Sequence, residues 1–186
     1  RHGTRMVNQS KEEIRFFGHF LFCIDTKQNL KNELLEGLYN GSICDFWDFR
    51  MRNKNGKFLV FDYDGGYHHK ENRIRRDTEK TTNIINQEDN TFAIRYRTHG
   101  SAPLKIHMET EQSDRVVIIQ EQRKVSLKEQ MATLYENGKD ILSKFLSEEE
   151  MCSFKRRHRD PLPKPVRGVI DDVIKQLIRK EKEFLE

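Results

Sequence analysis

The feature that most constrains the fold of this chain is an apolar run, residues 58–61, that ends in two carboxylates, a diglycine and two histidines. Side chains alternate along a strand, so Asp62 and Asp64 share one face about 7 Å apart. A strand that is apolar on both faces is usually central and covered on both sides. The two carboxylates therefore mark the rim of a sheet, where the backbone breaks and a ligand can approach.

The glycines that follow bear on what these acids do. Gly65 and Gly66 permit a sharp turn with positive φ, which would return His68 or His69 toward the carboxylates. Two acids and a histidine at one point can bind a divalent cation and move protons. The alternative is an ordinary surface turn, because Asp-Gly is also a common turn signal.

Composition places the chain among globular proteins. The 186 residues suffice for one domain with appended elements, and hydrophobic residues make up 35%. A net charge of +4 is compatible with an anionic partner. Three scattered cysteines without a CxxC pair argue against a zinc finger or a disulfide framework, so we expect an intracellular protein in a reducing compartment. No apolar run approaches the length of a membrane span, and we expect no membrane partner.

We divide the chain into three segments. Residues 1–28 form an N-terminal lead, 29–122 a core and 123–186 a helical C-terminal extension. Residues 1–5 are interpreted as foreign to the natural protein, with Met6 a candidate start.

The lead and the start of the core carry two apolar segments. Residues 14–24 can form a helical apolar stripe behind a capping-box spacing at Ser10 and Glu13, although residues 20–24 could equally be a strand. Residues 29–39 predict a helix with leucines at every fourth position, ended by Asn40 and Gly41. Glu33 flanks this apolar stripe and points either at the sheet or into solvent.

A hairpin is predicted next. Residues 43–52 are rich in aromatic residues and indicate a strand, and 53–56 indicate a turn before the strand that contains Asp62. Asp45 and Asp48 fall on the first strand. Carboxylates inside apolar strands are costly to bury unless they are paired or bound to a metal, so these acids need partners.

The pattern then alternates between helix and strand. Residues 73–86 predict a helix that presents Asp77 and Lys80 on one face. Strands are predicted at 92–97 and 116–119. This strand–helix–strand order indicates a crossover and therefore a mixed α/β sheet.

The C-terminal extension is helical. Capping signals open a helix over 126–145 and a shorter one after Ser147. A basic cluster at 155–159 and a stiff proline-rich linker at 161–165 precede an amphipathic helix over 169–185. The extension either packs on the sheet or binds a partner.

The motifs of residues 30–106 occur in a characteristic order. They are Asp48-Phe, then Phe61-Asp62-Tyr-Asp64-Gly-Gly-Tyr-His68-His69, then Asp77-Thr-Glu-Lys80-Thr, then Phe92-Ala-Ile-Arg95-Tyr-Arg97, then Pro103-Leu104. Over a little more than 40% of the chain, this order resembles the very-short-patch-repair-like nucleases of the PD-(D/E)XK superfamily, in the EDxHD branch that includes homing endonucleases. The resemblance implies a restriction-endonuclease-like mixed β-sheet flanked by helices, here with the C-terminal helical extension.

Several residues match the motif of that family. Glu33 matches its helix glutamate, and Asp48 its hairpin acid, with Asp45 as a rival register. Asp62 takes the D/E position. Asp64 stands where most of the superfamily has a lysine, a departure typical of this branch. That departure removes the group that would orient the attacking water.

The resemblance implies other candidates for that role. His68 or His69 could supply it, as could Lys80 reaching from the helix, and Asp77 matches the final acid of the motif. A histidine titrates near neutrality and suits proton transfer. Lys80 could also offset charge on the phosphate.

The resemblance also implies a metal cofactor and a nucleic-acid partner. Asp48 and Asp62, with Asp64, would hold Mg²⁺ or Mn²⁺ through hard oxygen ligands. Arg95 and Arg97 would offset phosphate charge, or would simply pack on the sheet. The remaining candidates for backbone contact are Lys155, Arg156, Arg157 and Arg159.

The implied activity is that of a metal-dependent endonuclease that acts on double-stranded DNA, as a monomer or a homodimer. A site-specific, homing-like role is favoured over mismatch repair, because the zinc ligands of the repair enzymes are missing. The alternative is a non-catalytic module that keeps a nuclease fold for nucleic-acid binding or assembly.

Overall fold

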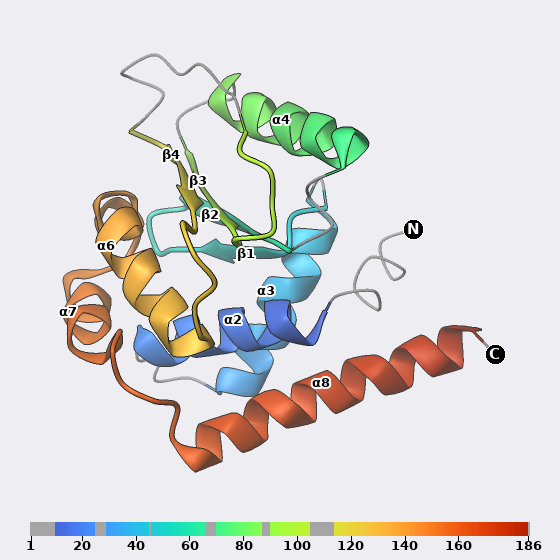
Figure 1. Ribbon diagram of the computed structural model, residues 1–186. Coiled ribbons are helices and arrows are strands. Elements are labelled where there is room, and N and C mark those ends of the chain that lie inside the picture. The colour runs from blue at the N-terminus through green and yellow to red at the C-terminus, as the bar shows by residue number, and fades with distance from the viewer. Residues whose placement is uncertain are drawn as a thin grey trace.

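The computed structural model describes residues 10–24, 29–44, 46–65, 70–86, 90–104 and 114–185. A four-stranded sheet in the order β1-β2-β3-β4 lies between helices (Figure 1). In chain order the elements are α2 (Lys11–Cys23), α3 (Leu30–Ser42), β1 (Phe49–Arg52), β2 (Phe58–Asp64), α4 (Glu71–Asn86), β3 (Thr91–Arg97), β4 (Val116–Gln120), α6 (Leu127–Phe145), α7 (Glu148–Arg157) and α8 (Lys164–Leu185).

The sheet is mixed, as the sequence predicts. β1 and β2 pair antiparallel, and the Asn53 N–H donates to the Lys57 carbonyl at 2.9 Å across the tight turn between them. Gly56 has φ of 76°, which favours glycine. α4 then crosses over, so that β2 and β3 run parallel, and β4 pairs parallel to β3. The predicted hairpin, crossover and mixed α/β class are confirmed.

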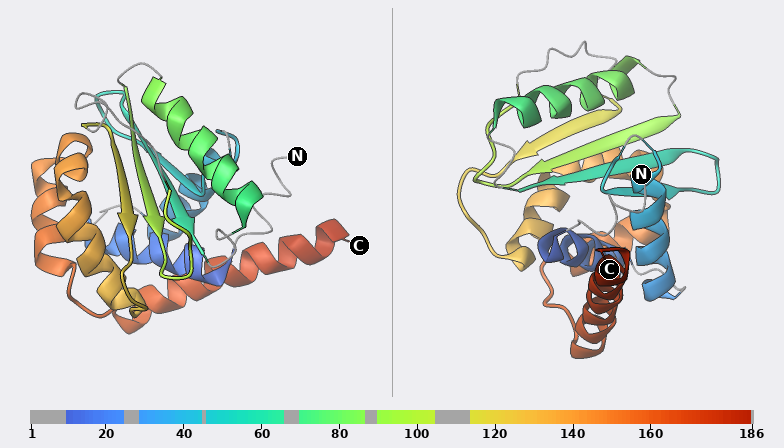
Figure 2. Two further views of the ribbon diagram at one scale, coloured as in Figure 1. Left: turned by 45° about the horizontal axis from the view of Figure 1, so that its top comes forward. Right: turned by 90° about the vertical axis from the view of Figure 1, so that its right-hand side faces the viewer.

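Helices cover both faces of the sheet unequally. α2, α3 and α6 lie against one face, with α7 and α8 packed on them, and α4 lies across the other face (Figure 2). Within the described part of the chain, α4 is the helix that encloses the row of side chains containing Asp62 and Asp64.

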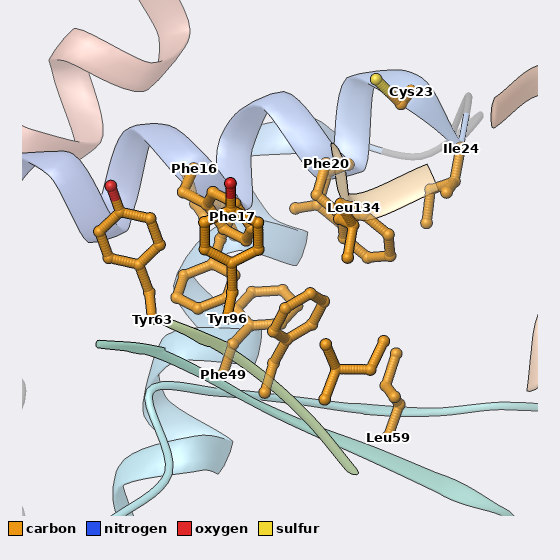
Figure 3. Packing of buried hydrophobic residues seen from close by; sticks show 14 of the residues in the cluster. Phe16, Phe17, Phe20, Cys23, Ile24, Phe49, Leu59, Tyr63, Tyr96 and Leu134 are labelled. Atoms are coloured by element: carbon orange, nitrogen blue, oxygen red, sulfur yellow. The ribbon is translucent and has the colours of Figure 1, made fainter. Parts of the chain in front are cut away.

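The main core lies between α2 and the sheet. Phe16 and Phe17 of α2 meet Phe61 of β2 with ring centroids 5.6 and 5.4 Å apart. The rings of Tyr63 and Tyr96 stack at 5.9 Å below the same helix (Figure 3). The same cluster contains side chains from all three segments predicted from the sequence, from Ile14 to Leu177. The N-terminal lead and the C-terminal helices therefore complete the core of the sheet.

The N-terminal segment left open by the sequence is a helix, α2, and its predicted cap, Ser10, is confirmed as the N-cap. The end of the next helix differs from the prediction. α3 runs through Asn40 and Gly41 and ends at Ser42, so the predicted stop signal lies inside the helix. Glycine is required at position 41 because α3 approaches the backbone of Trp47 closely there: a Cβ would lie 2.5 Å from the Trp47 carbonyl oxygen.

Two further predictions were wrong in extent. β1 is limited to four residues, because residues before it turn: the Trp47 N–H contacts the Cys44 carbonyl at 3.4 Å, and Phe46 has φ of 56°. Asp48 therefore precedes the strand. α8 begins at Lys164, inside the predicted linker, since proline is accepted in the first helical turn, where Pro165 stands.

None of the described helices combines the length and the apolar character needed to traverse a lipid bilayer.

Candidate functional site

A cluster of charged side chains lies between the sheet and α4. The parallel register aligns Asp62 with Arg95 and Asp64 with Arg97 on neighbouring strands. All four residues are buried, at 0–2% exposure. Buried charges are tolerated when they are paired and hydrogen-bonded, so the pairing within this cluster decides what it can do.

Two carboxylates are each held by a backbone hydrogen bond where the hairpin begins. The Asp48 N–H donates to Asp62 Oδ1 at 2.9 Å, and the Tyr63 N–H donates to Asp48 Oδ2 at 2.9 Å. Asp48 and Asp62 are 3% and 2% exposed. Backbone donors thus fix both carboxylates in place.

Lys80 of α4 reaches down to this acidic pair. Its Nζ lies 2.8 Å from Asp62 Oδ2, 2.9 Å from the Phe46 carbonyl oxygen and 4.6 Å from the centroid of the Trp47 ring. The lysine side chain is 17% exposed, whereas that of Asp62 is 3% exposed. Lys80 is therefore the member of this contact that a solvent-borne anion can approach.

Asp64 is enclosed by two guanidinium groups. Arg95 Nη1 donates to its two oxygens at 2.8 and 2.9 Å, and Arg97 Nη1 donates to Oδ2 at 2.7 Å. Asp77 joins from α4, 3.3 Å from Arg95 Nη1 and 3.0 Å from Arg97 Nη1. The two arginines thus link β2, β3 and α4 through buried ion pairs.

Arg95 is the hub of the cluster. Its Nη2 lies 2.8 Å from Asp62 Oδ2, and the N–H is not aligned for a hydrogen bond, so the contact is electrostatic. Burial alone would lower the pKa of this guanidinium, but the charges of Asp64, Asp62 and Asp77 outweigh it and raise the pKa above its ordinary value. Arg95 therefore remains a permanent cation.

The structure brings together seven of the residues predicted from the sequence, namely Asp48, Asp62, Asp64, Asp77, Lys80, Arg95 and Arg97. Glu33 lies in the first turn of α3, half-buried, on a helix that packs against β1. His68, His69 and the rival acid Asp45 lie outside the described residues.

The roles predicted for two arginines change. Arg95 and Arg97 are 1% and 0% exposed and are paired with carboxylates, so they neutralise the protein's own acids. Of the two interpretations that the sequence left open, the buried geometry favours packing on the sheet over direct contact with a phosphate.

The basic cluster of α7 is remote from this site. α7 packs on α2 and α6, which cover the sheet face opposite α4 (Figure 1). Lys155, Arg156 and Arg159 are exposed there. Arg157 is half-buried, and its Nη1 donates to the Phe22 carbonyl at 3.1 Å, which gives it a structural role.

The carboxylates of the cluster differ in how well they suit the Mg²⁺ or Mn²⁺ that the resemblance implies. Within the described residues, no three His, Cys, Asp or Glu side chains are arranged to hold a metal ion. Asp48 and Asp62 fit a magnesium-type ion better than the other acids, because such an ion is usually bound by one or two carboxylates together with water and substrate phosphate, although Lys80 and Arg95 contact one oxygen of Asp62. Asp64 and Asp77 fit poorly, because each is contacted by both guanidinium groups.

Sequence reasoning missed two neighbours of the cluster. Thr81, fully buried on α4, accepts a hydrogen bond from Arg95 Nε at 3.1 Å. Its position four residues after Asp77 was the available signal, because that spacing places both on one helix face. Trp47, which precedes Asp48, contacts both Lys80 and Arg95 with its ring.

Comparison of the chain with protein-family models, with curated proteins and with solved structures found no match in any of the three. The chain is therefore defined by its architecture: a mixed α/β protein with a buried charged cluster between an open sheet and one helix.

Proposed function

We propose that the protein is a metal-dependent endonuclease that hydrolyses phosphodiester bonds in double-stranded DNA at specific sites. The observation that carries the proposal is that the Asp48 and Asp62 carboxylates each accept a backbone hydrogen bond from the other's segment, with Lys80 in contact with Asp62. Two hard-oxygen ligands and one partly exposed cation form a minimal set for binding a divalent ion and a phosphate.

The order of elements supports the same class. A helix with Glu33, a hairpin with Asp48 and Asp62, a helix with Asp77 and Lys80, and a further strand follow one another as α3, β1, β2, α4 and β3. This is the order implied by the resemblance to the EDxHD branch of the PD-(D/E)XK nucleases. We therefore propose the restriction-endonuclease-like fold as the finer description of this sheet.

Within the proposal, Asp48 and Asp62 would hold Mg²⁺ or Mn²⁺. A cation held there would supply Lewis-acid chemistry toward the scissile phosphate and the attacking water. Lys80 orients a phosphate oxygen by charge, and its contact with the Phe46 carbonyl limits its freedom. His68 and His69 stay the candidates for moving the proton of the attacking water.

Asp64 and Asp77 receive a different role from the one that the resemblance assigned. With Arg95 and Arg97 they form a rigid charged frame beneath the acidic pair. The frame holds Asp62 through Arg95 and balances charge in a region from which water is excluded. We propose that both acids support the site and do not ligate the metal.

The DNA approaches from the side of α4 in this proposal. Lys70, Arg75 and Arg76 are exposed at the start of that helix, on the same side of the sheet as Lys80. Their positive charges favour contact with DNA phosphates, whatever the base sequence. The exposed cations of α7 lie on the opposite side, where they would contact a second copy of the chain or a duplex that wraps around the protein.

One observation favours the alternative, a non-catalytic nucleic-acid-binding or assembly module. Asp62 Oδ2 is already contacted by Lys80 and Arg95, which neutralise the charge that a metal would otherwise balance. Activity requires a divalent cation and a phosphate to displace Lys80 from this contact. A module without catalysis would keep the ion pair permanently.

The test is nicking of a supercoiled plasmid, which detects a single break per molecule. Wild-type protein is compared with Asp62→Asn and with Asp171→Asn, the same substitution at an exposed acid of α8. We expect Mg²⁺- or Mn²⁺-dependent nicking that EDTA stops, that Asp62→Asn loses by about a hundredfold or more, and that Asp171→Asn retains.

The outcomes separate the two functions. DNA binding without nicking under any divalent cation would favour the non-catalytic module. Nicking that Asp62→Asn retains in full would place the catalytic centre elsewhere. Faster cleavage of duplex RNA than of DNA would reassign the substrate and keep the site.

A further inference from the structure

Both carboxylate oxygens of Asp62 have partners within the protein. Oδ1 accepts the Asp48 N–H at 2.9 Å. Oδ2 lies 2.8 Å from Lys80 Nζ and 2.8 Å from Arg95 Nη2, so two cations share this one oxygen. A divalent cation binds through carboxylate oxygens and is repelled by other cations at the same atom. Metal binding at Asp62 therefore requires a cation to withdraw from Oδ2.

The two cations differ in their freedom to withdraw. Arg95 is 1% exposed and is held by two further carboxylates and by the Thr81 hydroxyl, so its position is fixed. The Lys80 side chain is 17% exposed. Its flexible four-carbon stem lets the ammonium swing toward solvent while the backbone of α4 stays in place. Lys80 is therefore the partner of Oδ2 that can exchange with a metal.

Two further contacts hold the ammonium of Lys80 against the site. Nζ lies 2.9 Å from the Phe46 carbonyl oxygen and 4.6 Å from the centroid of the Trp47 ring. Phe46 presents that carbonyl with φ of 56°, which is strained for a residue other than glycine. Such strain is concentrated at functional sites, where the surrounding structure enforces it. The contact of Lys80 is thus built into the turn before β1.

The charges of the cluster indicate which ligand releases Lys80. Its seven residues carry four carboxylates and three cations, which leave one negative charge in a region almost closed to water. A divalent cation alone would turn this into one positive charge. A phosphodiester carries one negative charge, so a metal and one phosphate together leave the site neutral. Uncompensated charge is costly where water is excluded, so the two ligands favour each other.

We propose that Lys80 couples metal binding to phosphate binding: it occupies Asp62 Oδ2 in the free protein and transfers to a phosphodiester oxygen when both ligands are present. This inference rests on the proposed function for the identity of the ligands. A ligand binds more weakly when its site must first be vacated, and a second ligand that removes this cost produces positive cooperativity. The effect is reciprocal, so the protein holds the metal weakly until a nucleic-acid phosphate arrives.

Electron paramagnetic resonance of Mn²⁺ measures the coupling on the full-length protein without a DNA target. Mn²⁺ is titrated with wild-type protein in a concentration series of dimethyl phosphate, and in sodium chloride at equal ionic strength. Dimethyl phosphate is a phosphodiester with one negative charge and no base. We expect it to lower the dissociation constant of Mn²⁺ at least about fivefold, in a saturable manner.

Variants of Lys80 assign the coupling to this side chain. Lys80→Met removes the ammonium and keeps the apolar stem, so it should bind Mn²⁺ at least about fivefold more tightly than wild type in sodium chloride, and dimethyl phosphate should then change the affinity by less than about twofold. Lys80→Gln is also neutral, retains a donor for the Phe46 carbonyl and replaces Lys80→Met if that variant folds poorly. Lys144→Met is the control, because Lys144 is 43% exposed and lies 3.7 Å from Asp114. It should behave as wild type.

Two results would overturn the proposal. One is Mn²⁺ binding to wild type that dimethyl phosphate leaves unchanged. The other is a neutral Lys80 variant that binds Mn²⁺ no more tightly than wild type, or that keeps the full phosphate effect, since the metal alone would then account for it. Plasmid nicking without this coupling would refute the role of Lys80 and keep the nuclease. Coupled binding without nicking would keep the role of Lys80 and refute catalysis.

Discussion

Replacing Asp64 with asparagine tests the charged frame most severely. Its carboxylate is fully buried and accepts from Arg95 Nη1 at 2.8 and 2.9 Å and from Arg97 Nη1 at 2.7 Å. Asp64→Asn keeps the shape, removes one negative charge and turns an amide donor toward the guanidinium groups. Breaking a buried ion pair from one side costs about 3–5 kcal/mol, so the melting temperature should fall by roughly 6–20 °C.

Urea denaturation followed by circular dichroism measures this loss. The matched control is Asp114→Asn, because Asp114 is 71% exposed and lies 3.7 Å from Lys144. An exposed pair of this kind contributes about 0–1 kcal/mol. If Asp64→Asn cost less than about 1 kcal/mol with an unchanged denaturant slope, the frame would not stabilise the fold and the reasoning would fail.

Three further predictions concern packing and pH. Gly41→Ala should lower the free energy of unfolding by about 1–3 kcal/mol, because its Cβ would lie 2.5 Å from the Trp47 carbonyl oxygen; an unchanged melting temperature would refute this. Burial lowers the pKa of His19 below 6.5, so the unfolded chain takes up a proton first as pH falls. The free energy of unfolding should therefore decrease below about pH 6.5, and His19→Gln should flatten its pH dependence between about pH 8 and pH 5. Burial raises the pKa of Tyr63, so stability should also fall above about pH 10, and a flat alkaline profile in urea titrations would contradict this.

Local signals were enough to predict the central topology. The turn at residues 53–56 joins two apolar runs, and the helix over α4 has a clear polar and apolar periodicity, so the hairpin and the crossover could be inferred. The spacing of Asp77 and Lys80 placed both on one helix face, as observed.

Other features depend on contacts that no local pattern encodes. α2 was ambiguous because it is buried on nearly all sides, so its apolar residues lose helical periodicity. The pairing of Asp64 with Arg95 and Arg97 follows from the parallel register of β2 and β3, which the sequence does not specify. The close approach of α3 to Trp47 likewise explains why glycine stands at position 41, inside that helix.

The central claim is that Asp48 and Asp62 form the metal-binding pair while Asp77 belongs to the frame. Electron paramagnetic resonance of Mn²⁺ measures this directly and does not depend on knowing the DNA target. We expect one bound Mn²⁺ per chain, an affinity at least about tenfold weaker in Asp48→Asn, and little change in folded Asp77→Asn. Equal affinity in wild type and Asp48→Asn, or no bound Mn²⁺ at all, would contradict it.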